Sequence, residues 1–278
     1  MSLMPKLSAI LLLSASLMAA TDAEVVAFLK KGIGGNPNIT NLQIDVNGKK
    51  ALSDMKGWQA YFINIDADVK QGSDTRHITQ NATYFVNGDI IAPELINVKT
   101  GGRLNDAISP DFNTAYYSKN NLISGDANSK YKVVIFSDPL CPFCRRYVPE
   151  ALEYMTKYPS TFGIYYYHFP LTGLHPASET LTKAAIAVEQ NGMEDAVMRL
   201  YKVDINANEK DDQKILDAFN RALKTKITIA DIRRASVIKQ FESDQKAAQA
   251  MMVGGTPTVF FNGQKDMTKM KYKEVKAK

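Results

Sequence analysis

The pattern of hydrophobic and polar positions changes near residue 131. Beyond that point, residues 133–136 form a short, continuously apolar run, which is typical of a central strand covered on both faces. Residues 162–169 form a second run of this kind. Apolar positions at three- and four-residue spacing predict helices after the cysteines to about residue 157, and at 176–190, 194–202, 211–223 and about 238–252. The chain ends with an expected strand at 258–261, a hairpin turn at Asn262-Gly263 and a helix begun near Asp266.

The preceding part of the chain predicts one helix and a small antiparallel sheet. A helix is expected at residues 21–32, with Thr21 or Asp22 as its N-cap and with one apolar face formed by Val25, Val26, Phe28 and Leu29. β-forming residues then cluster at 39–46, 58–69 and 75–91. Two dipeptides in this region favour hairpin turns, namely Asn47-Gly48 and Asn87-Gly88.

A connector is expected between the two parts. Residues 99–130 are rich in Gly, Asn, Ser and Asp, and they predict one short helix near residues 112–119. We therefore predict an α+β chain organised as a first domain at 21–98, a linker at 99–124 and a second domain at 125–278.

The first twenty residues resemble a targeting sequence. Lys6 precedes an apolar run at residues 7–20 that ends in small residues and is shorter than the roughly 20 apolar residues of a membrane span. We predict a secretory signal at residues 1–20 and an exported protein that is soluble after cleavage. A buried N-terminal helix or an uncleaved anchor is the alternative.

Composition narrows the classes of function. Hydrophobic residues make up 45% of the 278 residues and charged residues 23%, so a core can form without disulfides or metals. The 34 basic and 29 acidic residues give a formal charge of +5, and no block of consecutive Lys and Arg is present. Nucleic acid is therefore not expected as a partner.

The chain has only two cysteines, Cys141 and Cys144, in the motif Cys-Pro-Phe-Cys. A disulfide between them would close a ring of four residues, which constrains the unfolded chain very little. A chemical role is therefore a better explanation than a structural one. Half of a zinc site is the alternative, but two cysteines and three histidines scarcely provide four ligands, so neither a metal nor another cofactor is expected.

The position of Cys141 predicts its reactivity. It follows an apolar strand and begins a helix, where free backbone N–H groups and the helix dipole stabilise a thiolate. Cys141 is therefore the expected nucleophile, and Cys144, one turn further on, is the expected resolving thiol. Pro142 suits the first helical position. Phe143 adds no positive charge near the thiolate, so we expect a weaker oxidant than an enzyme with Cys-Pro-His-Cys.

A second motif, Gly254-Gly255-Thr256-Pro257-Thr258, leads into the last apolar strand. A proline at a strand start after flexible glycines can accommodate a cis peptide bond, but a trans bond is commoner for proline in general. If the bond is cis, the Thr256 backbone would face the cysteines and pair with an extended substrate segment.

Six further side chains are interpreted without a catalytic role. We expect His77, His168 and His175 to be surface or capping residues. Tyr165-Tyr166-Tyr167 is interpreted as a set of aromatics that alternate between core and surface, since it lies in a β-rich run. The remaining chemistry is thus concentrated in the two motifs.

These motifs resemble those of the periplasmic DsbA, DsbC and DsbG group of disulfide enzymes in the thioredoxin superfamily. The resemblance rests on residues 136–144, Phe-Ser-Asp-Pro-Leu-Cys-Pro-Phe-Cys, together with Gly255-Thr256-Pro257, and it covers about residues 125–278. It implies a thioredoxin-like domain with a helical insertion, in which Pro257 is cis and lies against the cysteine pair.

The first domain resembles DsbC and DsbG in layout only. That resemblance implies a small cystatin-like α+β dimerisation domain, a linker and a V-shaped homodimer. Thr256 also resembles the DsbC and DsbG side, where DsbA has valine. However, Cys-Pro-Phe-Cys differs from the CGYC and CPYC motifs of those relatives, so oxidase and isomerase activities both stay open.

We therefore predict a periplasmic thiol-disulfide oxidoreductase that forms or isomerises disulfides in exported proteins. Its expected partners are unfolded or misfolded exported proteins with cysteines, and a membrane redox partner of DsbB or DsbD type. The predicted catalytic residues are Cys141 and Cys144, and the predicted substrate-binding residues are Thr256, Pro257, Pro142 and Phe143. The alternative is a holdase-type chaperone whose redox activity is dispensable.

Overall fold

The computed structural model describes residues 19–277. The predicted signal sequence lies outside the described residues, apart from its last two positions. The chain divides into two compact units, with the boundary between Pro93 and Glu94. Within residues 19–277, none of the helices combines the length and the apolar character that a membrane span requires.

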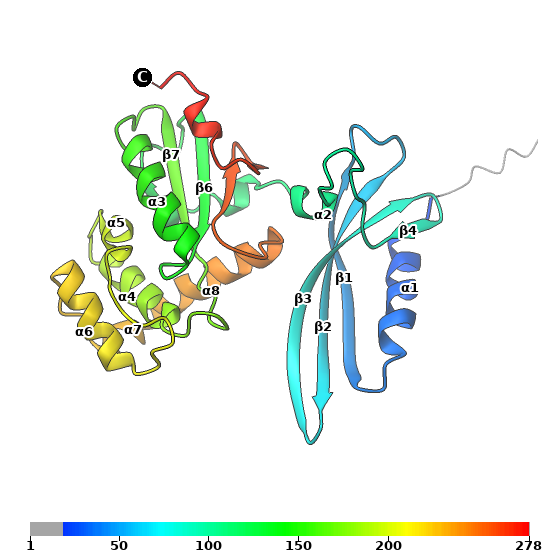
Figure 1. Ribbon diagram of the computed structural model, residues 1–278, viewed down its shortest axis with the longest axis horizontal. Coiled ribbons are helices and arrows are strands. Elements are labelled where there is room, and N and C mark those ends of the chain that lie inside the picture. The colour runs from blue at the N-terminus through cyan, green and yellow to red at the C-terminus, as the bar shows by residue number, and fades with distance from the viewer. Residues whose placement is uncertain (1–18, 278) are drawn as a thin grey trace, which may run out of the picture. The chain divides into compact units, whose positions relative to one another are not determined.

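The first unit is an antiparallel sheet with one helix packed on it (Figure 1). The strand order is β1-β2-β3-β4, with bounds β1 Ile39–Ala51, β2 Gln59–Gln71, β3 Asp74–Asn87 and β4 Ile90–Ala92. Helix α1 (Asp22–Gly34) begins with a capping box between Thr21 and Glu24, and it buries Val25 and Leu29 against the sheet. This is the helix and small antiparallel sheet that the sequence pattern predicts.

Two local expectations in this unit are wrong. Asn47-Gly48 is not a hairpin turn, because β1 continues through it with a bulge between Val46 and Gly48 while pairing with β2. Phe28 is 60% exposed rather than buried with its helical neighbours. A turn does connect β3 and β4 near Asn87-Gly88, but it is shifted by one residue: Asn87 pairs with Ile90, and Gly88-Asp89 form the turn, with Gly88 at a φ of 56°.

The second unit is built on a mixed sheet in the order β5-β7-β6-β8-β9. Its strands are β5 Leu122–Ser124, β6 Tyr131–Ser137, β7 Phe162–His168, β8 Thr258–Phe261 and β9 Gln264–Lys265. Strands β6 and β7 are parallel, while β8 pairs antiparallel with β6. The predicted apolar run at 133–136 is therefore the centre of the sheet and is fully buried.

Helices cover both faces of this sheet. On one face, α3 (Pro142–Met155) packs Val148 and Leu152 against Val133 and Ile135 of β6. On the other face, α8 (Ala235–Ala250) contributes Ala247 and Ala248 to a cluster that contains alternate residues of β6 and β7. The two clusters together make β6 a strand buried on both sides, which explains its continuous run of apolar residues.

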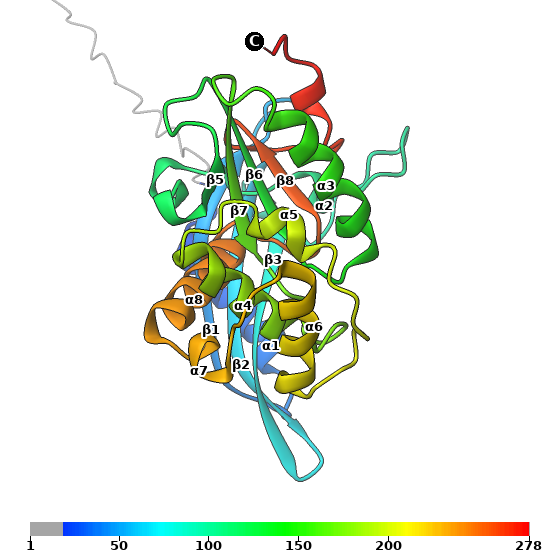
Figure 2. The same ribbon diagram turned by 90° about the vertical axis from the view of Figure 1, so that its left-hand side faces the viewer.

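A helical insertion separates β7 from β8. It consists of α4 (Ser178–Gln190), α5 (Ala196–Leu200), α6 (Asp212–Leu223), α7 (Ile229–Ile232) and α8, and α4, α5, α6 and α7 share one apolar core with part of α8. These helices gather below the sheet as it is drawn in Figures 1 and 2. The predicted α+β fold with a helical insertion in its second part is confirmed. The short helix α7 was not predicted.

The segment expected as a linker, 99–124, contributes to the second unit. Phe112 is buried in one of its clusters, and β5 pairs antiparallel with β7. The short helix expected near 112–119 is a 3₁₀ turn, Thr114–Tyr116. The other short elements here are α2 (Leu104–Ala107) and a second 3₁₀ turn, Lys119–Asn121. The segment is rich in Gly and Asn, so its sequence did not indicate that Phe112 fills a core position.

Three other expectations in the second unit are wrong. The terminal helix near Asp266 is absent from the described residues, where only a 3₁₀ turn, Lys271–Lys273, is formed. Asp266 is instead buried, and it accepts hydrogen bonds from the backbone N–H groups of Thr268 and Lys271. Tyr165, Tyr166 and Tyr167 are all buried, and so is His168, because β7 is covered on both faces.

Candidate functional site

The candidate site begins where β6 ends and α3 starts. Cys141 is the N-cap residue of α3, with an extended backbone at φ −65° and ψ 123°, and Pro142 is the first helical residue. The carbonyl of Cys141 accepts the first helical bond, from Arg145 N at 3.0 Å. Proline fits this position because it needs no N–H donor. Cys141 thus lies at the helix end where backbone N–H groups are free to face an anion.

The turn between β6 and α3 is organised by the carboxylate of Asp138. Its Oδ1 accepts hydrogen bonds from Leu140 N at 2.7 Å and Cys141 N at 3.2 Å, and also from Ser178 Oγ at 2.7 Å. Its Oδ2 accepts from Leu171 N at 2.7 Å and lies 2.9 Å from His175 Nδ1. Asp138 is fully buried and joins the cysteine turn to the start of the helical insertion.

This role of Asp138 was not predicted from the sequence. Asp138 was visible as part of the motif before Cys141, but three of its five partners lie 33 to 40 residues further along the chain. His175 was interpreted as structural, and its contact with Asp138 agrees with that interpretation. The sequence signal that could have indicated this role is an acidic residue directly after an apolar strand. A carboxylate that is buried there needs several hydrogen-bond donors.

The loop before β8 meets the cysteines from a distant part of the sequence. The Thr256–Pro257 peptide bond is cis, which is the isomer that the family resemblance implies. Thr258 pairs with Phe136, so the register of β8 on β6 places this loop beside the cysteine turn. The Cys141 thiol donates to the Thr256 carbonyl oxygen at 3.5 Å. The predicted residues Cys141, Thr256 and Pro257 are therefore brought together.

The two cysteines lie in different environments. Both thiols are free and buried, Cys141 at 5% exposure and Cys144 at 0%. Burial raises the pKa of the Cys144 thiol to about 12, against a smaller lowering by hydrogen bonding from the hydroxyls of Ser137 and Thr256. Cys144 is therefore held as a thiol in the resting site, and its ionisation needs help from the groups around it.

The outer rim of the site is partly apolar. Phe143 is 62% exposed, and Pro142 beside it is also exposed. The Arg146 guanidinium lies 5.8 Å from the centre of the Phe143 ring, a distance that allows a cation–π contact. An exposed aromatic side chain thus lies two residues from Cys141 and leaves apolar surface beside the cysteine pair.

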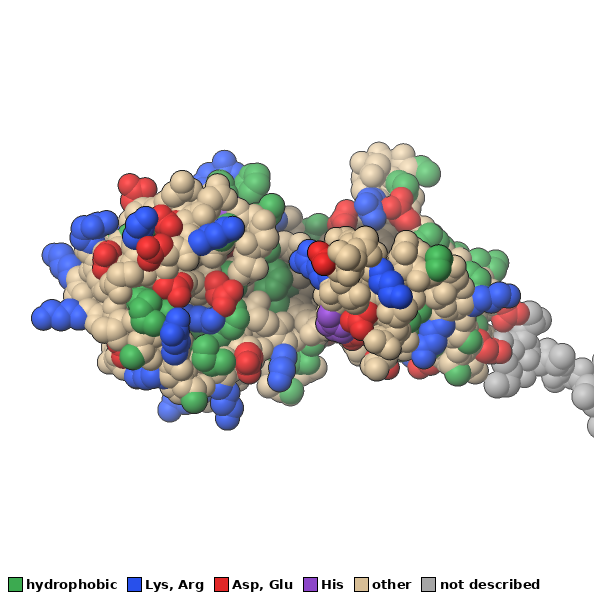
Figure 3. Space-filling view, turned by 90° about the horizontal axis from the view of Figure 1, so that it is seen from below, with side chains coloured by type: hydrophobic (Ala, Val, Ile, Leu, Met, Phe, Trp, Pro, Cys, Tyr) green, Lys and Arg blue, Asp and Glu red, His purple; other side chains and the backbone are tan. Residues whose placement is uncertain are grey.

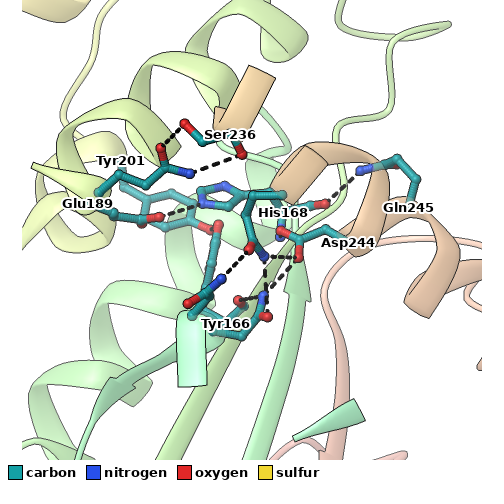
Figure 4. A network of polar contacts seen from close by, with 11 residues as sticks. Tyr166, His168, Glu189, Tyr201, Ser236, Asp244 and Gln245 are labelled. Carbon is teal, nitrogen blue, oxygen red and sulfur yellow. Dashed lines mark hydrogen bonds and ion pairs between the residues drawn. The ribbon is translucent and has the colours of Figure 1, made fainter. Parts of the chain in front are cut away.

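A network of buried polar groups lies beneath the site, and part of it is drawn in Figure 4. His168 Nε2 lies 3.3 Å from Glu189 Oε2, and the His168 backbone N–H donates to Asp244 at 3.0 Å. Although burial alone lowers the pKa of His168, the nearby carboxylates of Glu189 and Asp244 outweigh it and raise the pKa above its ordinary value. His168 was expected at the surface or as a cap, and it is instead a core residue.

The surface and the titratable groups offer few other sites. On the face drawn in Figure 3, basic and acidic side chains are interspersed. Across residues 19–277, no group of three or more His, Cys, Asp or Glu side chains is placed to hold a metal ion. The cysteine pair with its cis-proline loop is thus the constellation that carries chemistry in the described chain.

This fold and this site define a thioredoxin-fold protein with a cysteine pair at the start of a helix. The family model described as thioredoxin matches residues 117–278, which is more than half of the chain. The chain therefore belongs to the thioredoxin family.

Two curated relatives are antiporters. The chain is 30% identical over 150 residues to the Na(+)/H(+) antiporter NhaA 3 of Salinispora tropica, and 28% identical over 151 residues to the Na(+)/H(+) antiporter NhaA 1 of Salinispora arenicola. Each match covers 51% of this chain and 22% of the relative. The chain thus spans about a fifth of the length of these relatives.

Several solved structures are similar to part of this chain. BdbD from Bacillus subtilis (oxidised) gives a TM-score of 0.48 at 19% identity, over 62% of this chain and 95% of that one. Proteus mirabilis ScsC in a compact conformation gives 0.44 at 19% identity, over 54% and 73%. A periplasmic thioredoxin-like protein from Salmonella enterica serovar Typhimurium gives 0.45 at 17% identity, over 58% and 90%. At these identities and TM-scores, no activity is transferred from them to this chain.

Proposed function

We propose that this protein is a thiol-disulfide oxidoreductase acting on cysteine-containing polypeptides. The observation that carries the proposal is the position of Cys141, at the N-cap of α3 and 3.5 Å from the Thr256 carbonyl that precedes the cis-proline. A thiol at a helix N-terminus is stabilised as a thiolate, and a second thiol one turn away can close a disulfide with it. Cys144 occupies that second position.

Reduction of a substrate disulfide by the reduced Cys141–Cys144 pair takes two steps. The Cys141 thiolate attacks one sulfur of a substrate disulfide, so that a Cys141–substrate bond forms and the other substrate sulfur leaves as a thiolate. The Cys144 sulfur then attacks Cys141, the intramolecular disulfide forms and the second substrate thiolate leaves. The substrate gains two electrons and the Cys141–Cys144 pair loses two. Disulfide formation in a substrate is the same sequence in reverse.

The substrate is proposed to bind as an extended segment across the cis-proline loop. The Thr256 backbone offers hydrogen bonds to an added strand, as peptide-binding sheet edges do. The exposed side chains of Pro142 and Phe143 offer apolar contact beside the reactive sulfur. A polypeptide with a cysteine flanked by extended, partly apolar residues fits these features.

Substitution of each cysteine tests the proposal. Cys141→Ser should abolish exchange with both oxidised and reduced substrates. Cys144→Ser should retain the first step and accumulate mixed disulfides, visible on a non-reducing gel. If neither variant changes the rate of exchange, or if the unsubstituted protein exchanges with no disulfide, the proposal is wrong.

The direction of the reaction and the setting are also proposed. We propose a periplasmic location and a redox partner of DsbB or DsbD type that keeps the pair oxidised or reduced. Refolding of reduced against scrambled ribonuclease separates a disulfide oxidase from an isomerase. A homodimer through the first unit is proposed on the exposed apolar side chains of Phe28 and Ile90, and light scattering on the full chain tests it.

The same exposed side chains favour a second candidate, a holdase-type chaperone. Phe28 and Ile90 are 60% and 64% exposed, and exposed apolar surface of this kind can bind unfolded polypeptides. An aggregation assay on a variant with both cysteines replaced by serine separates the candidates. Full protection of a client by that variant would mean that binding does not need the thiols.

A further inference from the structure

Three buried hydroxyl groups form a chain beneath the cysteine pair. Ser137 Oγ lies 2.6 Å from the Tyr201 hydroxyl, which in turn lies 2.6 Å from the Tyr166 hydroxyl. These residues come from the end of β6, the C-cap of α5 and the middle of β7, and they are 0%, 6% and 1% exposed. Tyr166 and Tyr201 are seen close together in Figure 4. We call Ser137, Tyr201 and Tyr166 the hydroxyl chain.

The hydroxyl chain ends at the resolving cysteine. Cys144, Tyr166 and Tyr201 belong to one buried cluster, and the side chains of Ser137 and Thr256 act on the Cys144 thiol by hydrogen bonding. The side-chain partners of Cys144 are hydroxyls rather than carboxylates, because the one buried carboxylate nearby, Asp138, accepts bonds from other donors. The polar contacts of the fully buried Cys144 are therefore hydroxyl groups together with the Asp138 backbone N–H.

The hydrogen bonds of the hydroxyl chain can run toward the Cys144 sulfur or away from it. Three hydroxyls hold three protons, and the two internal hydrogen bonds use only two of them. When the Cys144 sulfur is a thiolate, all three can donate toward it, and when it is a thiol, Ser137 can accept from it. Linked hydroxyls polarise one another, so the bond to the sulfur is stronger than one isolated hydroxyl would make.

We propose that the hydroxyl chain governs the second half-reaction, by stabilising the Cys144 thiolate at the moment when it attacks the mixed disulfide. This inference rests on the proposed function. Ser137 contacts the reacting sulfur, whereas Tyr201 and Tyr166 are positioning residues that act through Ser137. In this step the Cys144–Cys141 bond forms and the Cys141–substrate bond breaks. The substrate sulfur leaves with the electron pair and takes up the proton that Cys144 gives up, while the three hydroxyls keep their own protons.

The surroundings of the chain keep it protonated. Burial raises the pKa values of Tyr166 and Tyr201 well above their ordinary value, so both stay donors throughout the working range of pH. The groups that act electrostatically on them are each other, Cys144 and, for Tyr166, the carboxylate of Glu189, which disfavours loss of the Tyr166 proton.

Arg145 fixes the position of the middle hydroxyl. Its Nη2 donates to the Val203 carbonyl at 2.6 Å, its Nη1 to the Tyr201 carbonyl at 3.4 Å and its Nε to the Pro139 carbonyl at 3.0 Å. One side chain of α3 thus joins the cysteine turn to the backbone that carries Tyr201. These bonds help to hold the backbone of Tyr201 beside the cysteine turn.

The test separates the two half-reactions. The reduced full chain is mixed with excess oxidised glutathione, quenched with acid at successive times and analysed by mass spectrometry. Formation of the glutathione adduct on Cys141 reports the first step, and its disappearance into the internal disulfide reports the second. The variants are Ser137→Ala and Tyr201→Phe. The control is Tyr167→Phe, which removes a buried hydroxyl of the same strand that donates to the Tyr116 carbonyl on the other face of the sheet.

Loss of a hydrogen bond to a charged sulfur predicts a second step about ten- to a hundredfold slower in Ser137→Ala. Tyr201→Phe should slow it by roughly three- to tenfold, because Ser137 remains but is no longer polarised. In both variants the second step should stop rising with pH only at a higher pH than in the parent, because the Cys144 thiolate is less stabilised. Adduct formation should stay within about twofold of the parent, and Tyr167→Phe should change neither step.

Two results overturn the inference. The first is a second step in Ser137→Ala and Tyr201→Phe that matches that of Tyr167→Phe in rate and pH profile. The second is an equal slowing of both steps, which would mean general damage to the site. If the parent protein itself forms no glutathione adduct, the proposed function fails instead, and that outcome is distinct from both.

Discussion

Replacing Asp138 by Asn should destabilise the second unit, because this carboxylate accepts every hydrogen bond that it makes. Its Oδ1 has three donors and its Oδ2 has two, and the side chain is fully buried. An Asn side chain of the same shape has one acceptor oxygen and one NH₂ group, so one of the two positions must become a donor.

The least costly arrangement places the NH₂ group at the Oδ2 position. His175 can then accept from it by changing tautomer, but Leu171 N is left facing another donor. Leaving one buried backbone N–H unsatisfied costs about 1–3 kcal/mol, and placing the NH₂ group at Oδ1 would leave two of them unsatisfied, those of Leu140 and Cys141. We therefore expect a loss of about 1–3 kcal/mol in the free energy of unfolding.

Urea unfolding of the full chain measures this loss, with Asp204→Asn as the matched control. Asp204 is exposed in the same unit, and its substitution should stay within about 0.5 kcal/mol of the parent. The transition midpoint of Asp138→Asn should fall while its slope is unchanged. A midpoint equal to that of the Asp204→Asn control would refute the hydrogen-bonding argument.

Three other predictions concern pH, backbone strain and redox balance. Burial raises the pKa of Asp244 from 3.8 to about 6, so its contribution to stability is present below about pH 4 and is lost as the pH rises through 6. Between these pH values the free energy of unfolding of the parent should therefore fall by on the order of 2–3 kcal/mol relative to that of Asp244→Asn, as measured by thermal unfolding. Stability curves of the two proteins that run parallel with pH would contradict this. Gly125→Ala should destabilise by several kcal/mol, since its Cβ would lie 1.8 Å from the Phe162 carbonyl, whereas Gly192→Ala, also at positive φ but in open space, should show only the smaller backbone strain in the same urea assay. Phe143→His should shift the equilibrium with glutathione to a more oxidising potential by roughly 30 mV. The absence of a shift at a pH low enough for the histidine to be charged would count against the electrostatic argument.

Local sequence signals predicted the parts of this protein that depend on neighbouring residues. The apolar run at 133–136 indicated a strand buried on both faces, and Pro142 after Cys141 indicated a helix start. These features follow from backbone geometry and from the periodicity of burial, which act over a few residues. The candidate cysteine pair was accessible from the sequence for the same reason.

Contacts between distant residues were decided only by the tertiary structure. The Thr256 carbonyl reaches Cys141 across 115 positions through the register of β8 on β6, and Tyr201 reaches Ser137 across 64 positions through α5. The turn preference of a dipeptide also failed where strand pairing was stronger. Asn47-Gly48 stays within β1 because β1 pairs along its length with β2. Hydrogen-bond and packing energies are gained only when segments meet in space. The sequence therefore indicated which residues are candidates for reaction, and the fold determined which groups surround them.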